Sequence, residues 1–185
     1  MSKAALLVID VQDSFLHRDY WEESGLPAFR QAVSALIAGA RERGVPVVQV
    51  LHEDGEYPFD QASGLVRAQA WLPDAPDAIF IKHVHNAMIG SGLHEWLTER
   101  GIGKLLVCGI RTEQCCETTT RVASDLGYQV DFVSEATLTF AMTHPFSGKR
   151  YSPAEIREKT ELVLAGRFAR IASVAEALDG LPKER

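Results

Sequence analysis

Apolar residues occur along the chain in two alternating patterns. Short runs rich in β-branched residues are typical of strands buried in a parallel sheet, and the six predicted strands are Ala4–Asp10, Val45–Leu51, Ala78–Lys82, Lys104–Cys108, Tyr128–Val133 and Phe168–Ile171. Apolar residues recur at helical spacing in Leu26–Arg43, Gly92–Arg100, Glu113–Leu126, Pro153–Leu164 and Ser173–Leu178. The chain is therefore expected to alternate strand and helix.

This alternation predicts an α/β fold with three layers. An open, mostly parallel six-stranded sheet of the Rossmann-like kind would carry helices on both faces. We expect residues 1–185 to form a single domain, because the length fits one core and neither a linker nor a repeat interrupts the pattern. Two irregular stretches, Glu53–Asp77 and Glu135–Ser152, exceed the usual length of a connection, and such loops are often functional.

Composition and charge narrow the possible partners. The net charge of −6 disfavours binding to nucleic acid or to an anionic membrane, since both need a basic face. No apolar run approaches the roughly 20 residues of a membrane span, and the N-terminal run resembles a strand more than a signal peptide. Three cysteines, Cys108, Cys115 and Cys116, are too clustered for a disulfide framework, which favours a reducing cytoplasm.

Polar residues follow several predicted strands. In an open parallel sheet, ligands bind outside the carboxyl ends of the strands, where Asp10, His52, Lys82 and the turn that contains Cys115 would meet. A thiol becomes a nucleophile when it ionises, and a helix N-terminus or a nearby ammonium lowers its pKa. A carboxylate can accept the thiol proton. These residues predict a cysteine hydrolase.

Three segments carry a family resemblance: LLVIDVQDSF near the N-terminus, FIKHVHNAMIGSGL in the middle, and CGIRTEQCCETTTRVASDLGYQVDFVSEA later in the chain. Together they resemble the isochorismatase-like cysteine hydrolase superfamily, which includes nicotinamidases, N-carbamoylsarcosine amidases, ureidoacrylate amidohydrolases and isochorismatases. The resemblance implies the isochorismatase-like hydrolase fold for nearly the whole chain. The most specific motif is the turn G-x-x-T-x-x-C followed by E-x-T-x-R.

The resemblance also implies roles for individual residues. Asp10 is implied as the acid/base, Lys82 as the ammonium and Cys115 as the nucleophile. A cis peptide bond between Ile110 and Arg111 is implied as well, so that the backbone N–H groups of Arg111 and Cys115 form an oxyanion hole. Adjacent helical residues point about 100 degrees apart, and Cys116 is therefore expected to be a buried apolar residue, with a redox role as the alternative.

The stretch after the second predicted strand argues against a metal. Nicotinamidases carry an acid and histidines there, whereas VLHEDGEYPFD contains only His52. One histidine with scattered acids is a poor transition-metal site. We therefore expect no metal and no cofactor, and a supporting or wall position for His52.

The substrate pocket is less well defined by the sequence. Arg111 either clamps a substrate carboxylate or pairs with Glu113 or with another subunit. The remaining substrate-binding candidates come from the first motif, the strand ends and the long loops: Phe15, His52, Tyr57, Phe59, Asn86 and Phe140.

Three functions compete at this point. The first is hydrolysis of a C–N bond in a small amide or carbamoyl/ureido compound, through a thioester on Cys115. The second is vinyl-ether hydrolysis of the isochorismatase type, which does not need a cysteine. The third is noncatalytic binding of a small molecule on the same fold. The complete set of Asp10, Lys82 and Cys115 favours the first, and exposed aromatic loops and the resemblance favour a homo-oligomer, a dimer or a tetramer.

Overall fold

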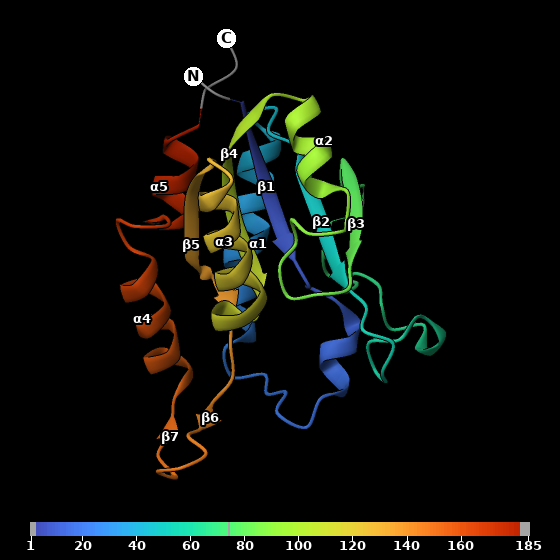
Figure 1. The fold of residues 1–185 in the computed structure, drawn as a ribbon, viewed down its shortest axis with the longest axis vertical. Helices are drawn as coiled ribbons and strands as arrows, with labels where there is room; N and C mark the ends of the chain where they lie inside the picture. The colour runs from blue at the N-terminus through green and yellow to red at the C-terminus, as the bar shows by residue number, and fades with distance from the viewer. Residues whose placement is uncertain (1–2, 74, 182–185) are drawn as a thin grey trace.

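A six-stranded parallel sheet forms the centre of the computed structural model, which describes residues 3–73 and 75–181 (Figure 1). The order of the strands is β3-β2-β1-β4-β5-β8, and every neighbouring pair is parallel. The strands are β1 Lys3–Ile9, β2 Val47–His52, β3 Ala78–Lys82, β4 Ile102–Ile110, β5 Gln129–Leu138 and β8 Arg170–Ile171. The six strands predicted from the apolar runs are therefore present, with β4 and β5 longer and β8 shorter than expected.

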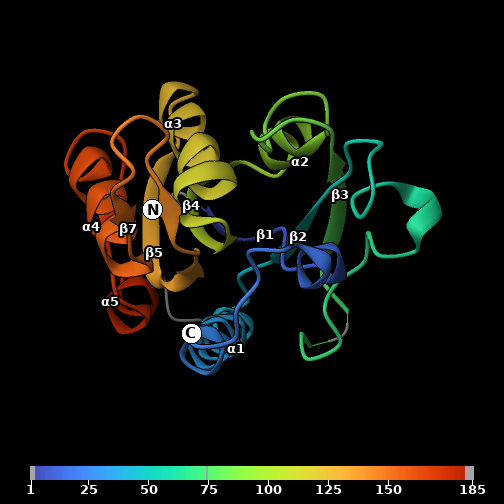
Figure 2. The same ribbon diagram turned by 90° about the horizontal axis from the view of Figure 1, so that it is seen from below.

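Helices cover both faces of the sheet, as Figure 2 shows from below. The helices are α1 Leu26–Arg41, α2 Leu93–Glu99, α3 Glu117–Asp125, α4 Pro153–Leu164 and α5 Val174–Asp179. Alternate residues of β1 point to opposite faces, so Leu6 and Val8 pack in one core with α1 and α5, while Leu7 and Ile9 pack in the other with α2, α3 and α4. The three-layer α/β architecture is thus confirmed.

The order of the strands reverses direction at β1, because the chain runs from β1 through β2 to β3 on one side and from β4 onward on the other. The edges of β1 and β4 come unusually close at their carboxyl ends. A side chain at Gly109, whose φ is +130°, would collide with the backbone of Ile9. The glycine therefore permits the close approach directly beside Asp10.

A small hairpin was missed by the sequence prediction. The segments Met142–Thr143 (β6) and Arg150–Tyr151 (β7) pair antiparallel within the expected irregular stretch. The hairpin extends beyond the carboxyl end of the sheet at the lower edge of Figure 1. Two short strands of two residues each carry no periodicity that a sequence pattern can reveal.

Short helical turns complete the connections. Asp13–His17 (η1) and Gln61–Ser63 (η2) are 3-10 turns, and Thr112–Cys116 (η3) is a π-helical turn that leads into α3. The helix predicted over Glu113–Leu126 therefore begins later, at Glu117. Across the described residues, no helix combines the length and the apolar character needed to cross a membrane.

Candidate active site

Asp10, Lys82 and Cys115 meet at the carboxyl ends of three strands of the sheet, as their places in the sequence predicted. Asp10 follows β1, Lys82 is the last residue of β3, and Cys115 lies in η3 after β4. The side chains of Asp10 and Lys82 are fully buried, and Cys115 is 5% exposed. Three segments far apart in the chain therefore place an acid, an ammonium and a thiol together in a cavity largely shielded from water.

The ammonium of Lys82 is the centre of this group. Its Nζ lies 2.9 Å from Oδ2 of Asp10, 3.4 Å from Sγ of Cys115 and 3.0 Å from Nδ1 of His52. An ammonium has three N–H groups to donate, so each can be directed at one of these partners. Burial alone lowers the pKa of Lys82, but the negative charges of Asp10 and of an ionised Cys115 outweigh it, and the pKa lies above its ordinary value.

His52 is held as a neutral acceptor for this ammonium. Burial, followed by the charge of Lys82, keeps the pKa of His52 below its ordinary value, and a neutral imidazole accepts at the nitrogen that carries no proton. The side chain of Gln12 fixes the backbone of His52 from both sides, because it accepts from His52 N at 2.7 Å and donates to His52 O at 2.9 Å. His52 and Gln12 thus act as supports for Lys82.

The thiol of Cys115 behaves differently from the expectation. A helix N-terminus and a neighbouring ammonium were expected to lower its pKa. Burial, followed by the charge of Asp10, raises the pKa of Cys115 well above its ordinary value, although Lys82 opposes that shift. The expectation omitted the cost of placing a thiolate at a buried position beside a carboxylate. Lys82 therefore lies between the carboxylate of Asp10 and a thiol whose pKa is raised.

The other two cysteines belong to the core. Cys116 and Cys108 are both fully buried, and burial raises the pKa of each thiol far above its ordinary value. Cys116 packs among the apolar residues of the core that α2, α3 and α4 cover. The structure thus places Cys115 at the cavity and Cys116 away from it.

The turn that carries Cys115 follows a cis peptide bond between Ile110 and Arg111. The π-helical turn Thr112–Cys116 comes directly after it, and backbone N–H groups in the first turn of a helix lack intrahelical acceptors. The use of the Arg111 and Cys115 N–H groups as an oxyanion hole stays a prediction.

A cavity of about 140 Å³ opens onto the thiol. Three of the predicted substrate-binding residues line it, namely Phe15, His52 and Phe59. Five residues that were not predicted also line it: Arg18, Tyr20, Asp54, His85 and Gln114. Arg18 and Tyr20 follow η1 in a polar segment without periodicity, so no local pattern could have identified them.

Four other predicted substrate-binding residues lie outside the wall of this cavity. Arg111 is 6% exposed and pairs with Glu113 at 2.9 Å, so the ion-pair alternative holds and the clamp does not. Asn86 accepts a hydrogen bond from the backbone of Met88 at 2.8 Å. Tyr57 is exposed at the surface, and Phe140 is buried in the core. Helical spacing and loop position could not distinguish these environments.

Metal ligands are not grouped in the described part of the chain. No cluster of three or more His, Cys, Asp or Glu side chains there has the arrangement to hold an ion. His85 stacks on His52 with ring centroids 6.0 Å apart, and His83 pairs with Glu53 at the surface. His83 and His85, two residues apart in the sequence, thus lie in different environments.

Comparison with known proteins assigns the chain to a family. The uncharacterised isochorismatase family protein YrdC of Bacillus subtilis is 26% identical over 98% of this chain and 97% of its own length. Nicotinamidase 3 of Arabidopsis thaliana is 29% identical over 74% of each chain. The crystal structure of an isochorismatase from Pseudomonas putida superposes with a TM-score of 0.83 and 29% identity, over 93% of this chain and 88% of that one. The isochorismatase domain family itself matches residues 4–153, and the chain therefore belongs to the isochorismatase family of hydrolases.

Proposed function

We propose that the protein is a cysteine hydrolase that cleaves the C–N bond of a small amide or of a carbamoyl or ureido compound. The observation that carries this proposal is the ammonium of Lys82, which contacts the carboxylate of Asp10 and the thiol of Cys115 at the same time. A vinyl-ether hydrolase does not need the thiol, and a binding protein needs none of the three groups. A nicotinamidase, an enzyme named for an amide, is among the relatives.

The chemistry begins with proton transfer from the thiol to Asp10. The sulfur attacks the substrate carbonyl carbon, and the backbone N–H groups of the η3 turn stabilise the oxyanion. The C–N bond then breaks while Asp10 returns the proton to the leaving nitrogen. The product of this half is a thioester on Cys115 and a free amine or ammonia.

Water completes the cycle. Asp10 accepts a proton from the water as its oxygen attacks the thioester carbonyl. The C–S bond breaks, the sulfur leaves as a thiolate, and Asp10 gives it the proton. The acid product departs, and the starting protonation state is restored without any net consumption of protons by the site.

Lys82 keeps its proton throughout this sequence. Its raised pKa suits it to remain an ammonium, so that it stabilises whichever of Asp10 and Cys115 carries the negative charge. When the proton passes from Cys115 to Asp10, the negative charge moves from the carboxylate to the sulfur, and both positions are in contact with the ammonium of Lys82. This arrangement explains how a thiol with a raised pKa can still supply a nucleophile.

The test is a search for the covalent intermediate. Purified protein is incubated with a panel of small primary amides and ureido compounds, released ammonia is measured, and intact-mass spectrometry follows acid quenching. We expect an acyl adduct on Cys115 for each amide that is turned over, and no adduct on the Cys115→Ala protein. Turnover of a vinyl ether by the Cys115→Ala protein would overturn the proposal.

We also propose that the protein self-associates. Of the aromatic loop residues that suggested this, Phe59 is buried and Trp71 packs against the core, but Phe146 is 94% exposed at the tip of the β6–β7 hairpin. An exposed phenylalanine on an extended hairpin favours burial against another copy. Light scattering at micromolar concentration should give at least twice the 20.4 kDa chain mass, and a monomer mass would contradict the proposal.

A further inference from the structure

Arg18 stands at the cavity of Cys115 and was assigned no role by the motifs. Its guanidinium lies 5.5 Å from the ring centroid of Tyr20 and 5.9 Å from that of Phe59. Arg18, Tyr20 and Phe59 all line the cavity that contains Cys115. Two aromatic rings therefore support a cation at the wall of the candidate active site.

The charge of Arg18 is not used by a protein carboxylate. Nearby arginines have such partners, since Arg67 pairs with Asp13 at 2.7 Å and Arg111 pairs with Glu113 at 2.9 Å. Within residues 3–73 and 75–181, Arg18 has aromatic contacts and no ion pair. The guanidinium donors are left available for a ligand.

The acidic groups of the cavity already have partners. Asp10 pairs with Lys82. Asp54 accepts a hydrogen bond from the backbone of Glu56 at 3.0 Å and lies 3.7 Å from Nε2 of His52. Neither carboxylate pairs with Arg18. A negative ligand group would therefore find a free cation on one side of the cavity and occupied anions elsewhere.

The dimensions of the cavity limit the size of the ligand. Its volume of about 140 Å³ corresponds to roughly five water molecules in the liquid. A compound of that size that reaches Cys115 with its carbonyl carbon has room for only a short chain before its other end meets the wall. A guanidinium fork matches a planar carboxylate in two parallel hydrogen bonds.

We propose that Arg18 is the specificity-determining residue of the site and binds a carboxylate at the far end of the substrate. The substrate class is then a short amide or ureido compound that carries a free carboxylate. The choice of amide or ureido compound rests on the proposed function, whereas the carboxylate is inferred from Arg18 itself. Arg111, for which a clamp was one of the alternatives, lies against the ring of Tyr20, 4.7 Å from its centroid, in a buried ion pair with Glu113.

Turnover of matched amides tests the inference first. Malonamate, succinamate and glutaramate each end in a carboxylate, and propanamide, butanamide and pentanamide end in a methyl group instead. We expect kcat/KM to be about 10- to 100-fold higher for the best carboxylate than for its neutral counterpart, the scale of one charge-assisted hydrogen bond. Arg18→Gln should remove this preference, so that the two kcat/KM values of the variant differ by less than about threefold, and Arg18→Lys should retain part of it.

A matched control separates the charge at this position from surface charge in general. Arg30 is also exposed and lies over a ring, 5.5 Å from the centroid of Trp71, but it is outside the cavity. Arg30→Gln should keep the carboxylate preference of the wild-type protein. An equal loss of preference in Arg30→Gln and Arg18→Gln would overturn the assignment to Arg18.

Binding without turnover distinguishes failure of the inference from failure of the proposed function. Succinamate and butanamide are titrated calorimetrically into the Cys115→Ala protein, with and without Arg18→Gln. Tighter binding of succinamate that depends on Arg18 supports the inference even if no amide is ever cleaved. Equal affinity for the two compounds, or a preference that survives Arg18→Gln, would sink it even if the thioester is found.

Discussion

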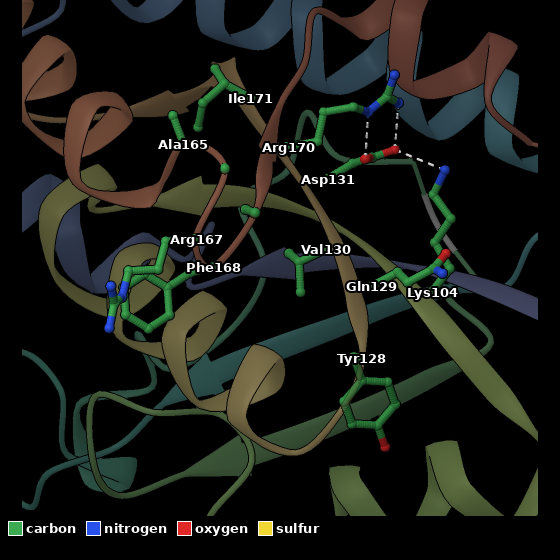
Figure 3. Close-up of a pocket in the computed structure, with 12 residues that line it drawn as sticks. Lys104, Tyr128, Gln129, Val130, Asp131, Ala165, Arg167, Phe168, Arg170 and Ile171 are labelled. Atoms are coloured by element: carbon green, nitrogen blue, oxygen red, sulfur yellow. Dashed lines mark hydrogen bonds and ion pairs between the residues drawn. The ribbon is translucent and has the colours of Figure 1, made fainter.

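Two buried aspartates at opposite ends of the sheet each pair with a lysine, but their environments differ. Asp10 lies 2.9 Å from the ammonium of Lys82 at the carboxyl ends of the strands, and Asp131 lies 2.9 Å from that of Lys104 at the amino ends. Asp131 also receives both arms of the Arg170 guanidinium, at 2.8 and 2.7 Å, as Figure 3 shows. Asp10 has no such fork, and its lysine is shared with a thiol and an imidazole.

The difference distinguishes an ion pair that joins strands from the ion pair of the candidate active site. Burial alone would raise the pKa of Asp131, but hydrogen bonds from Arg170 and Lys104 outweigh it and hold that pKa below its ordinary value. Both oxygens of Asp131 are thereby used to join β4, β5 and β8. The carboxylate of Asp10 pairs with the single ammonium of Lys82 and keeps acceptor capacity toward Cys115.

The volume of a cavity does not identify the end of the sheet that carries the candidate active site. The larger cavity, of about 720 Å³, lies beside Asp131 and is lined by Lys104, Arg167 and Arg170, among others. The cavity at Cys115 is about 140 Å³. The smaller one is lined by the thiol of Cys115 and the carboxylate of Asp10, which Lys82 contacts, so its chemical composition and not its volume marks it as the candidate active site.

Replacement of the two adjacent cysteines should give the largest effect. Cys115→Ala should abolish hydrolysis because no other side chain in the cavity can form the thioester. Cys116→Val should keep most of the activity, since the fully buried Cys116 packs as an apolar residue. Amide turnover and circular dichroism of both variants provide the measurement; a folded but inactive Cys116→Val protein would contradict the assignment of the nucleophile.

The two lysines should differ almost as strongly. Lys82→Met keeps length and packing but removes the charge, and we expect turnover to fall by roughly 10²-fold or more, as for the loss of one positioned electrostatic group. The pKa for alkylation of Cys115 by iodoacetamide should rise, because Lys82 lowers it in the native site. Lys104→Met is the matched control and should change turnover by less than about threefold.

Asp10→Asn completes the comparison of charges at the site. It should stop turnover but lower the pH at which Cys115 is alkylated, because the negative charge of Asp10 raises the pKa of the thiol. If the alkylation profiles of Lys82→Met and Asp10→Asn shift in the same direction, the separate roles of activating cation and proton acceptor are wrong.

Asp131→Asn should lower stability and spare catalysis. We expect a loss of about 2–3 kcal/mol in the free energy of unfolding at pH 7, the scale of hydrogen bonds to a charged group left incomplete. The folded-state pKa lies below the unfolded value of about 3.9, so this contribution is present above pH 4 and is lost as the pH falls through the folded-state pKa. Urea unfolding at pH 7 and pH 3 should therefore show the gap between the proteins narrowing in acid.

A surface pair provides the control for that measurement. Glu99 and Arg100 are 3.8 Å apart with largely exposed side chains, and Glu99→Gln should change the free energy of unfolding by less than about 0.5 kcal/mol. A comparable loss in Asp131→Asn and Glu99→Gln would show that the Asp131 cluster contributes nothing special.

Removal of metal should have the smallest effect of all. The described residues contain no cluster suited to an ion, and the proposed steps use only side chains, backbone and water. Turnover measured after exhaustive dialysis against EDTA should equal that of the untreated protein. Activity that disappears with EDTA and returns with zinc, manganese or iron would refute the metal-independent mechanism.

Much of the architecture was predictable because burial on both faces of a sheet leaves a strong sequence signal. The apolar runs identified the six strands, and the polar residues at their ends identified Asp10, Lys82 and Cys115, since parallel strands bring such ends together. The β6–β7 hairpin has strands too short to show a period. The π-helical start before α3 was missed because its residues are compatible with an ordinary helix.

The cavity wall was harder to predict than the reactive groups. Arg18 and Tyr20 reach it from an irregular segment, and only the folded chain shows that Arg111 lies against Tyr20. The pKa of Cys115 was expected on the wrong side because the sequence reveals charged neighbours but not the degree of burial. These are properties of tertiary contacts, which a linear pattern does not contain.

The backbone at Asp10 has a consequence for engineering this protein. Its φ of +53° lies in the left-handed region, which costs a residue with a Cβ atom about 1 kcal/mol or more, and its carboxylate is fully buried. Glycine and asparagine adopt that conformation more readily. Either residue would relieve that strain, but it would leave the fully buried ammonium of Lys82 without its counter-ion, which costs about 3–5 kcal/mol. A heat screen of this protein should therefore retain Asp10 even where activity is not selected.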